Sequence, residues 1–332
     1  MNRPSAANPR GLFRALVFAV LLPVCLPLVA RAQGYPQPRP ILMVVPFAPG
    51  GGTDSIAREL ARHLQGRLGQ SVVVDNRGGA GGAIGAAFVA QAKPDGHTLL
   101  FVTSTFVTAA ATERSLPYDV LKDFAPIAML GRGPLLLVVN PGTGIASVKQ
   151  LIEAAKARPE ALNFVSAGPG SINHLSGELF MQRAGVRMTH IPYKGSGPAT
   201  LDLISGQAQV FFATVPTILG QVRGERVRLL ATTGKTRSRL FPESPTVAES
   251  GVSQFNVDTW WGIVGPAGLQ SPAVTTLNQS VNEATAGDAL RKRFADEGAE
   301  PFRGGPAEFA EVLRDELRNW RKVVQDSGIK LD

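Results

Sequence analysis

The sequence has 332 residues, of which 44% are hydrophobic, so it is long enough to form two lobes that each bury a core. The formal net charge is +8, but residues 1–32 hold four arginines and no acidic residue, which leaves 30 basic and 26 acidic residues, or +4, for the rest. Because the basic residues are scattered among acidic ones, the composition argues against a nucleic-acid-binding protein.

Residues 1–32 have the pattern of a secretory signal peptide. Arginines precede the apolar run Ala15–Ala30, and Ala30-Arg31-Ala32 fits the A-x-A form of a cleavage site. We therefore expect export to the periplasm with cleavage near Ala32, and the alternative is an uncleaved membrane anchor. The only cysteine, Cys25, lies in this run, so the mature chain would have no thiol for a disulfide, a thiolate metal site or a cysteine nucleophile.

The stretch Ile41–Leu64 predicts a strand, a glycine-rich turn and a helix in immediate succession. Apolar Ile41–Val45 is typical of a buried strand, which the prolines and glycines of Pro46–Gly52 end. Thr53 is expected to cap a helix that begins at Asp54 and carries apolar residues at every fourth position. Such a turn leaves backbone N–H groups at the positive end of the helix dipole, where a small anion binds. The alternative is an ordinary tight connection between a strand and a helix.

Strands and helices continue to alternate, which predicts an α/β fold with parallel strands. Further strands are expected at 71–75, 97–103, 135–140, 163–165, 188–191, 207–212 and 227–232, and around Trp260-Trp261. Further helices are expected at 83–92, 147–157, 172–184 after a cap at Ser171, 198–205, 272–283, 287–296 and 306–325, the last three covering the first lobe. Thr103-Ser104 end the third strand at the edge where open parallel sheets bind ligands.

Six segments, in order over about residues 40–325, carry a further signal. They are Pro46–Asp54, Val73–Arg77 with Gly79–Gly82, Pro94–Leu100, Ser166–Gly168 with His174, Pro192–Gly195, and Pro245–Gly251. This set resembles the Bug family, the extracytoplasmic solute receptors of tripartite tricarboxylate transporters. The resemblance implies a two-lobed periplasmic binding protein of type II-like topology, with lobe 1 at 36–138 and 234–332 and lobe 2 at 139–233. It also implies a monomeric receptor that is not an enzyme and has no cofactor. A metal site is not expected, because His63, His97 and His190 show no H-E-x-x-H or comparable spacing.

In that family, the turn at Ala48–Thr53 (the first turn) and the turn at Ser166–Ser171 (the second turn) would face each other across a cleft and hold one carboxylate. A side chain at Gly52 would then intrude where the backbone approaches the ligand. The expected ligand-binding residues are Phe47, Ala48, Gly51, Gly52, Thr53, Thr103, Ser104, Ser166, Ala167, Gly168, Ser171, His174, Tyr193 and Ala213. The expected partners are a small organic acid and either permease subunits of a tripartite transporter or a sensor kinase.

One position departs from the family pattern. Ala213-Thr214 stand where members with acidic amino-acid or dicarboxylate ligands often have an acidic residue. The departure argues against an ammonium group and favours a plainer acid that is partly apolar or aromatic. The resemblance as a whole implies a small organic carboxylate, which is a di- or tricarboxylate or an aromatic acid.

Alternatives remain for single residues. Thr53 and Ser171 are helix caps whether or not they also reach a ligand, and Asp54 is expected to oppose the helix dipole. His174 and Tyr193 could donate to an anion or pack as structural residues. A hydrolase that uses Asp54, His174 and Ser166 is the second function considered, although no G-x-S-x-G motif is present. A nucleotide-binding module is disfavoured by the broken Walker A pattern before Gly234-Lys235-Thr236.

Overall fold

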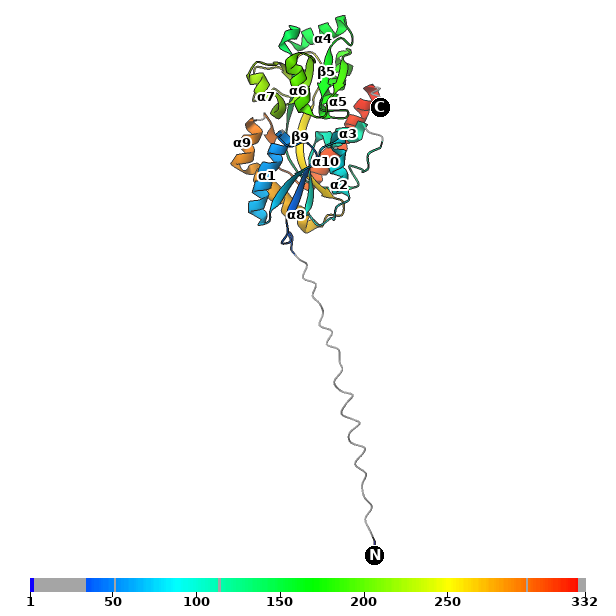
Figure 1. Cartoon of the computed structure of the whole chain (residues 1–332), viewed down its shortest axis with the longest axis vertical. Coiled ribbons are helices and arrows are strands. Elements are labelled where there is room, and N and C mark those ends of the chain that lie inside the picture. Colours follow the sequence, from blue (N-terminus) through cyan, green and yellow to red (C-terminus); the bar gives the residue numbers. More distant parts are fainter. Residues whose placement is uncertain (3–33, 51, 113–114, 297, 328–332) are drawn as a thin grey trace. The chain divides into compact units, whose positions relative to one another are not determined.

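The computed structural model describes residues 1–2, 34–50, 52–112, 115–296 and 298–327 (Figure 1). The expected cleavage site, Cys25, and Gly51 of the first turn therefore lie outside the described residues. Tyr35 begins a compact unit that holds the rest of the chain. No helix within these described ranges is long and apolar enough to cross a membrane.

The strands form one path of hydrogen-bonded neighbours. Its order is β2 (Val72–Asn76), β1 (Ile41–Val45), β3 (Thr98–Thr103), β9 (Asp258–Pro266), β4 (Phe124–Val139), β7 (Val210–Thr214), β5 (Asn163–Ser166) and β6 (Thr189–Pro192), and both β8 (Arg228–Thr232) and β10 (Glu300–Pro301) pair with β4 off this path. β1 pairs in parallel with β2 and β3, and β5 pairs in parallel with β6 and β7. β4 and β9 are antiparallel to their neighbours and join the two parallel groups. We call the part built on β1–β3 the first lobe and the part built on β5–β7 the second lobe.

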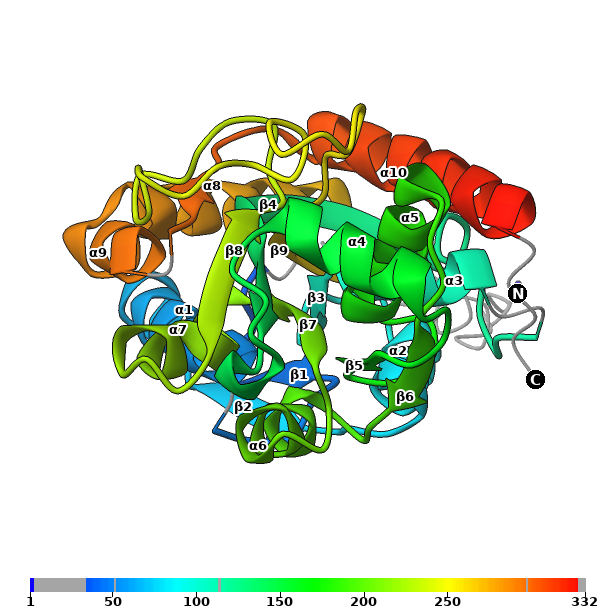
Figure 2. The same ribbon diagram turned by 90° about the horizontal axis from the view of Figure 1, so that it is seen from above.

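Helices bury both faces of each parallel group, as Figures 1 and 2 show. The first lobe has α1 (Gly52–Leu68), α2 (Ala83–Ala90), α3 (Ser104–Thr112), α8 (Ser271–Ala286) and α9 (Asp288–Asp296). The second lobe has α4 (Val148–Ala157), α5 (Ile172–Ala184), α6 (Ser196–Ser205) and α7 (Val215–Arg223). Because the first and second turns follow β1 and β5 directly, each turn leads from a buried parallel strand into a helix N-terminus.

Helix α10 (Pro306–Ser327) covers the first lobe, as expected, and also reaches the second. Its residues Phe309, Leu313 and Leu317 are buried in a first-lobe core, whereas Trp320 is buried in a second-lobe core. Figure 2 shows α10 running past α3 and α5, one from each lobe. The helix therefore packs against both lobes.

Strand β4 is longer than the segment 135–140 that the sequence predicts, because it begins at Phe124. Residues up to Pro134 pair with β9, and residues from Leu135 pair with β7 and β8. Gly131 argues against a strand in the sequence, because glycine weakens strand interiors. The structure gives the reason for this glycine, since a Cβ at 131 would lie 2.7 Å from the Glu300 carbonyl oxygen of β10. The division of the lobes at 138/139 and 233/234 stays a prediction.

The other expected elements are found with ends moved by at most three residues, but two helices were not predicted. They are α3 and α7, and each begins directly after a strand. Pro216 in the first turn of α7, after Thr214 at the N-cap, is a signal that could have revealed that helix. The expectation that Thr53 caps the first helix is wrong, since α1 already begins at Gly52. The predicted cap at Ser171 is confirmed.

Candidate functional site

The first turn is held by a buried carboxylate. Asp54, with 4% of its surface exposed, accepts hydrogen bonds from the Gly50 N–H at 2.9 Å, from Arg58 Nε at 2.9 Å and from Asn76 Nδ2 at 3.0 Å. Asn76 Nδ2 also donates to the Phe47 carbonyl oxygen at 3.1 Å. Asp54 and Asn76 therefore hold the chain at Phe47, directly before the turn, and at Gly50 within it, a role that goes beyond the predicted interaction with the helix dipole.

Electrostatics keep this carboxylate ionised. Burial alone would raise the pKa of Asp54, but the hydrogen bonds from Arg58, the Gly50 amide and Asn76, together with the charge of Arg58, lower it below its usual value. Asp54 therefore carries a negative charge at neutral pH. Because that charge is engaged by its own neighbours, it stabilises the turn and is not a free acid or base.

The second turn is fixed by two serine hydroxyls. Ser171 Oγ donates to the Gly168 carbonyl oxygen at 2.7 Å and accepts from the His174 N–H at 3.3 Å, which caps α5. Ser166 Oγ, which is fully buried, accepts from the Gly168 N–H at 3.1 Å. The Ala167 carbonyl oxygen accepts from the Gly195 N–H at 3.1 Å. These hydrogen bonds hold the second turn in place at the N-terminus of α5, where the N–H groups of the helix's first residues have no partner within the helix.

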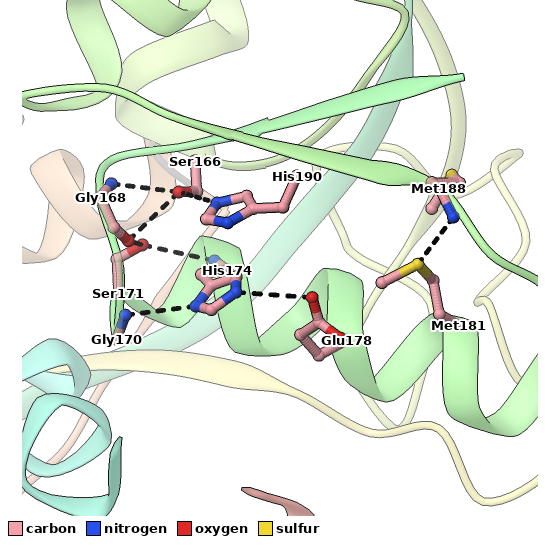
Figure 3. A network of polar contacts seen from close by, with 9 residues as sticks. All are labelled: Ser166, Gly168, Gly170, Ser171, His174, Glu178, Met181, Met188 and His190. Atoms are coloured by element: carbon pink, nitrogen blue, oxygen red, sulfur yellow. Dashed lines mark hydrogen bonds and ion pairs between the residues drawn. The ribbon is translucent and has the colours of Figure 1, made fainter. Parts of the chain in front are cut away.

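Two histidines stack beneath this turn (Figure 3). The rings of His174 and His190 lie 3.9 Å apart between centroids and 15° from parallel. His174 Nδ1 accepts from the Gly170 N–H at 3.2 Å, so the neutral ring carries its proton on Nε2, which lies 3.4 Å from Glu178 Oε1. Both ring nitrogens of His174 therefore have partners inside the protein, which favours the structural interpretation of this residue.

His190 completes the network. Its Nε2 lies 2.7 Å from Ser166 Oγ. Burial first, and the neighbouring His174 second, lower the pKa of His190 to about 3. His190 is therefore neutral at physiological pH. No local pattern predicts this pair, because the two residues come from α5 and β6 and approach each other only in the folded protein.

The remaining predicted site residues lie in varied surroundings. Buried Ser104 pairs through its hydroxyl with Thr259 at 2.9 Å, and buried Thr103 accepts from the Thr105 N–H at 3.3 Å. The Tyr193 hydroxyl donates to Asp202, and this hydrogen bond is the main reason that its pKa rises to about 12. Ala213 is fully buried in a second-lobe core. Phe47 and Ala167 are half-buried and Ala48 is exposed.

The lobes touch at both turns. A Cβ added at Gly52 would lie 2.1 Å from Pro216 Cβ in α7, and one added at Gly170 would lie 2.5 Å from Thr112 Oγ1 in α3. A Cβ at Gly81 would lie 3.9 Å from the Pro169 carbonyl oxygen of the second turn. The residues of both turns are therefore at the face where the lobes meet.

The space beside the first turn is small in this arrangement. A cavity of about 10 Å³ has room for roughly one water molecule. Its walls are formed by Pro46, Phe47, Gly81, Gly82, Ala86, Thr103, Phe106 and Tyr118. A hollow of about 430 Å³ lies elsewhere, at the C-terminal ends of α4 and α5, and shares no residue with either turn.

Comparisons with known proteins cover nearly the whole compact unit. Residues 56–329 match the family described as the tripartite tricarboxylate transporter family receptor. Protein BugT of Bordetella pertussis is 42% identical over 302 residues, which cover 90% of this chain and 92% of BugT. The structure of R. palustris Rpa4515 with adipate has a TM-score of 0.84 at 35% identity and covers 89% of this chain and 99% of that chain.

A second solved structure, of the periplasmic binding protein BugD, has a TM-score of 0.82 at 32% identity and covers 88% of this chain and 98% of that chain. Two such matches over almost the full length of the solved chains confirm the two-lobed α/β binding-protein fold that the sequence predicts.

Proposed function

Because the chain belongs to the tripartite tricarboxylate transporter receptor family, whose members are solute-binding receptors and not enzymes, we propose that it captures a small organic carboxylate between its lobes. One observation carries this proposal. The two turns that begin α1 and α5 come from opposite lobes and both lie where the lobes touch. A carboxylate placed there would lie at the N-termini of both α1 and α5.

The physical chemistry favours an anion at this place. Each helix N-terminus stabilises a nearby negative charge by about 0.3–1 kcal/mol, and more when the site is partly buried. Hydrogen bonds to a charged acceptor contribute roughly 1.5–3 kcal/mol each. The ligand-binding set that we propose is the predicted one apart from His174, which joins Asp54, Asn76 and His190 as a residue that supports the turns and need not touch the ligand.

We infer an acid without an ammonium group. The last two residues of β7 are Ala213 and Thr214, and the Thr214 hydroxyl pairs with that of Thr217 at 2.8 Å at the start of α7. No carboxylate stands in these positions to neutralise an ammonium group. The adipate bound by Rpa4515 supports a dicarboxylate among the acids considered.

The proposed cellular context follows from the family. The chain is exported by a signal peptide that is cleaved near Ala32, and it acts as a monomer in the periplasm. The bound acid is handed to permease subunits of a tripartite transporter or reported to a sensor kinase. The similarity to periplasmic binding proteins such as BugD supports this location.

The geometry does not favour the hydrolase considered above. Ser166 Oγ contacts His190 and Gly168, His174 contacts Gly170 and Glu178, and Asp54 contacts residues of the first lobe. Within the described part of the chain, no hydrogen bond joins the side chains of these three residues, so they do not form the nucleophile, base and orienting acid that the hydrolase needs.

A ligand panel tests the proposal. The purified mature protein is mixed with adipate, malate, citrate, benzoate and glutamate, and its thermal unfolding is followed, with the acids then quantified by NMR. We expect at least one acid to stabilise the protein, by about 2.7 kcal/mol at one hundred times its Kd, and to be recovered unchanged. If every acid leaves Tm unchanged, or if an acid is converted to product, the proposal is wrong.

A further inference from the structure

Gly52 touches a residue of the opposite lobe. It is the first residue of α1, and Pro216 lies in the first turn of α7. A Cβ at Gly52 would lie 2.1 Å from Pro216 Cβ and 2.7 Å from Pro216 Cγ. Separations below 3.0 Å are not tolerated by real Cβ atoms, and the proline ring cannot rotate away. The two lobes can therefore meet here only because residue 52 has no side chain.

A second contact of the same kind lies at the other turn. A Cβ at Gly170 would lie 2.5 Å from Thr112 Oγ1 and 3.2 Å from Ala109 Cα, both in α3 of the first lobe. Gly170 has a φ of +71°, so any substitution there also strains the backbone. Each turn thus presents a glycine to the opposite lobe, and Gly52 is the one whose substitution tests the lobe contact alone.

Another glycine in the same helix provides the contrast. Gly66 also lies within α1, but nothing lies within 4 Å of a Cβ added there. An alanine at 66 removes only the backbone freedom of glycine, and this stabilises a helix. The requirement for glycine at 52 therefore comes from the position of α7 and not from the needs of α1.

We propose that Gly52 and Pro216 form the contact at which the two lobes meet in the closed receptor, and that they set how far the lobes close. This inference rests on the proposed ligand capture only for its effect on affinity. Gly52 belongs to the proposed ligand-binding set, and in the structure it also lies against Pro216 of α7. The proline ring is the stop against which the first turn comes to rest.

The contact between Gly52 and Pro216 affects ligand binding because it changes the fraction of receptor molecules whose lobes are closed. The apparent affinity of a receptor falls in proportion to the fraction that is competent to bind, here the closed fraction. A side chain at 52 holds the lobes apart, so it lowers the closed fraction and speeds ligand release while the fold of each lobe is kept. Removal of the proline ring relieves the collision and restores closure.

A disulfide tests the contact without any ligand. Gly52→Cys and Pro216→Cys are combined in the mature protein, whose sequence after residue 32 has no cysteine, and the bond is followed by mass spectrometry under diamide. A small opening motion brings the two Cβ atoms to the separation of ~3.8 Å that a disulfide needs. We expect rapid and nearly complete closure of this bond within one chain.

The control combines Gly52→Cys with Arg223→Cys. Arg223 is exposed and lies seven residues further along α7, roughly 10 Å away, so this pair should remain reduced. If the 52/216 pair stays reduced in a protein whose circular dichroism is that of the wild type, the lobe contact does not exist.

Adipate binding by calorimetry tests the effect on affinity. We expect Gly52→Ala to weaken adipate binding at least tenfold, Gly66→Ala to leave it unchanged, and Gly52→Ala with Pro216→Gly to recover most of the loss. Weakening without recovery would mean that residue 52 faces the ligand, and this overturns the inference while leaving the proposed function intact. If adipate does not bind the wild type, the disulfide experiment alone decides the inference.

Discussion

The Asp54 carboxylate accepts a hydrogen bond from the Asn76 amide at 3.0 Å, and this contact joins the N-terminal end of α1 to the end of β2. Asn76 uses the same nitrogen to hold the Phe47 carbonyl oxygen, and Asp54 holds the Gly50 N–H. The shape of the first turn is therefore determined by two side chains that lie outside the glycine run. Their loss should affect both stability and ligand binding.

Asp54→Asn should lower both properties. The substitution removes the charge that Arg58 faces at 2.9 Å and weakens acceptance from the Gly50 N–H. We expect a loss of roughly 1–3 kcal/mol in the free energy of unfolding and a clear fall in carboxylate affinity. Urea denaturation and calorimetry measure the two effects.

Asp75→Asn is the matched control, because Asp75 pairs with Arg77 at 2.7 Å near the same turn but is 31% exposed. Its effect on stability should stay within about 0.5 kcal/mol. Equal effects of the two substitutions would contradict the role assigned to Asp54.

Asp54 also predicts an acid dependence of stability. Its pKa is lowered in the folded protein, so its contribution is present above the unfolded pKa of about 3.9 and is lost as the pH falls toward the folded value. Wild-type protein should therefore lose stability below pH 4 more steeply than Asp54→Asn. Urea midpoints at pH 7, 4 and 3 measure this, and parallel curves for the two proteins would refute it.

The pKa of His190 should make the stability of the protein depend on pH over a second, higher range. Its folded pKa of about 3 lies below the usual unfolded value of about 6.5, so the unfolded chain binds one more proton between these values. Stability should fall as the pH drops through this range, by about 1.4 kcal/mol for each pH unit from this residue. Histidine NMR checks the cause directly, since the ring signals of His190 should not titrate between pH 8 and pH 5. A midpoint near 6.5 would show that the ring is not kept neutral by its surroundings.

Two helix caps separate stability from binding. Ser171 caps α5 at the second turn, and Ser147 caps α4 through a 3.2 Å hydrogen bond from the Gln150 N–H. Alanine at either position should cost about 0.5–2 kcal/mol of stability. Only Ser171→Ala should also weaken carboxylate binding, because Ser171 Oγ positions the Gly168 carbonyl oxygen as well. Loss of affinity in Ser147→Ala would mean that the binding assay reports stability and not the site.

Local patterns predict much of the fold. Ile41–Val45 and the helix after it follow from an apolar run, a glycine turn and regular spacing, all of which act within a few residues. The N-terminal half of β4 was missed because Gly131 is required by a neighbouring strand from the far end of the chain. Helix α7 was missed even though Pro216 marks its start.

The sequence predicts the candidate site less completely than it predicts the fold. The two turns were predicted from glycine patterns and family resemblance, and the structure finds both at helix N-termini. The partners of Asp54 and the stacking of His174 on His190 depend on which strands pair, and this is not encoded locally. Nothing in the sequence shows that a contact between the lobes requires residue 52 to be a glycine, and this steric reason appears only when Pro216 is found beside it in the structure.

The central claim is that one carboxylate is held jointly by turns from both lobes. A crystal structure of the mature protein with a bound acid from the panel, at a resolution that shows the carboxylate oxygens, tests this claim most directly. We predict a carboxylate within hydrogen-bonding reach of backbone N–H groups of both Ala48–Thr53 and Ser166–Ser171, either directly or through one water. A carboxylate bound to one lobe alone, or at a site that touches neither turn, would contradict it.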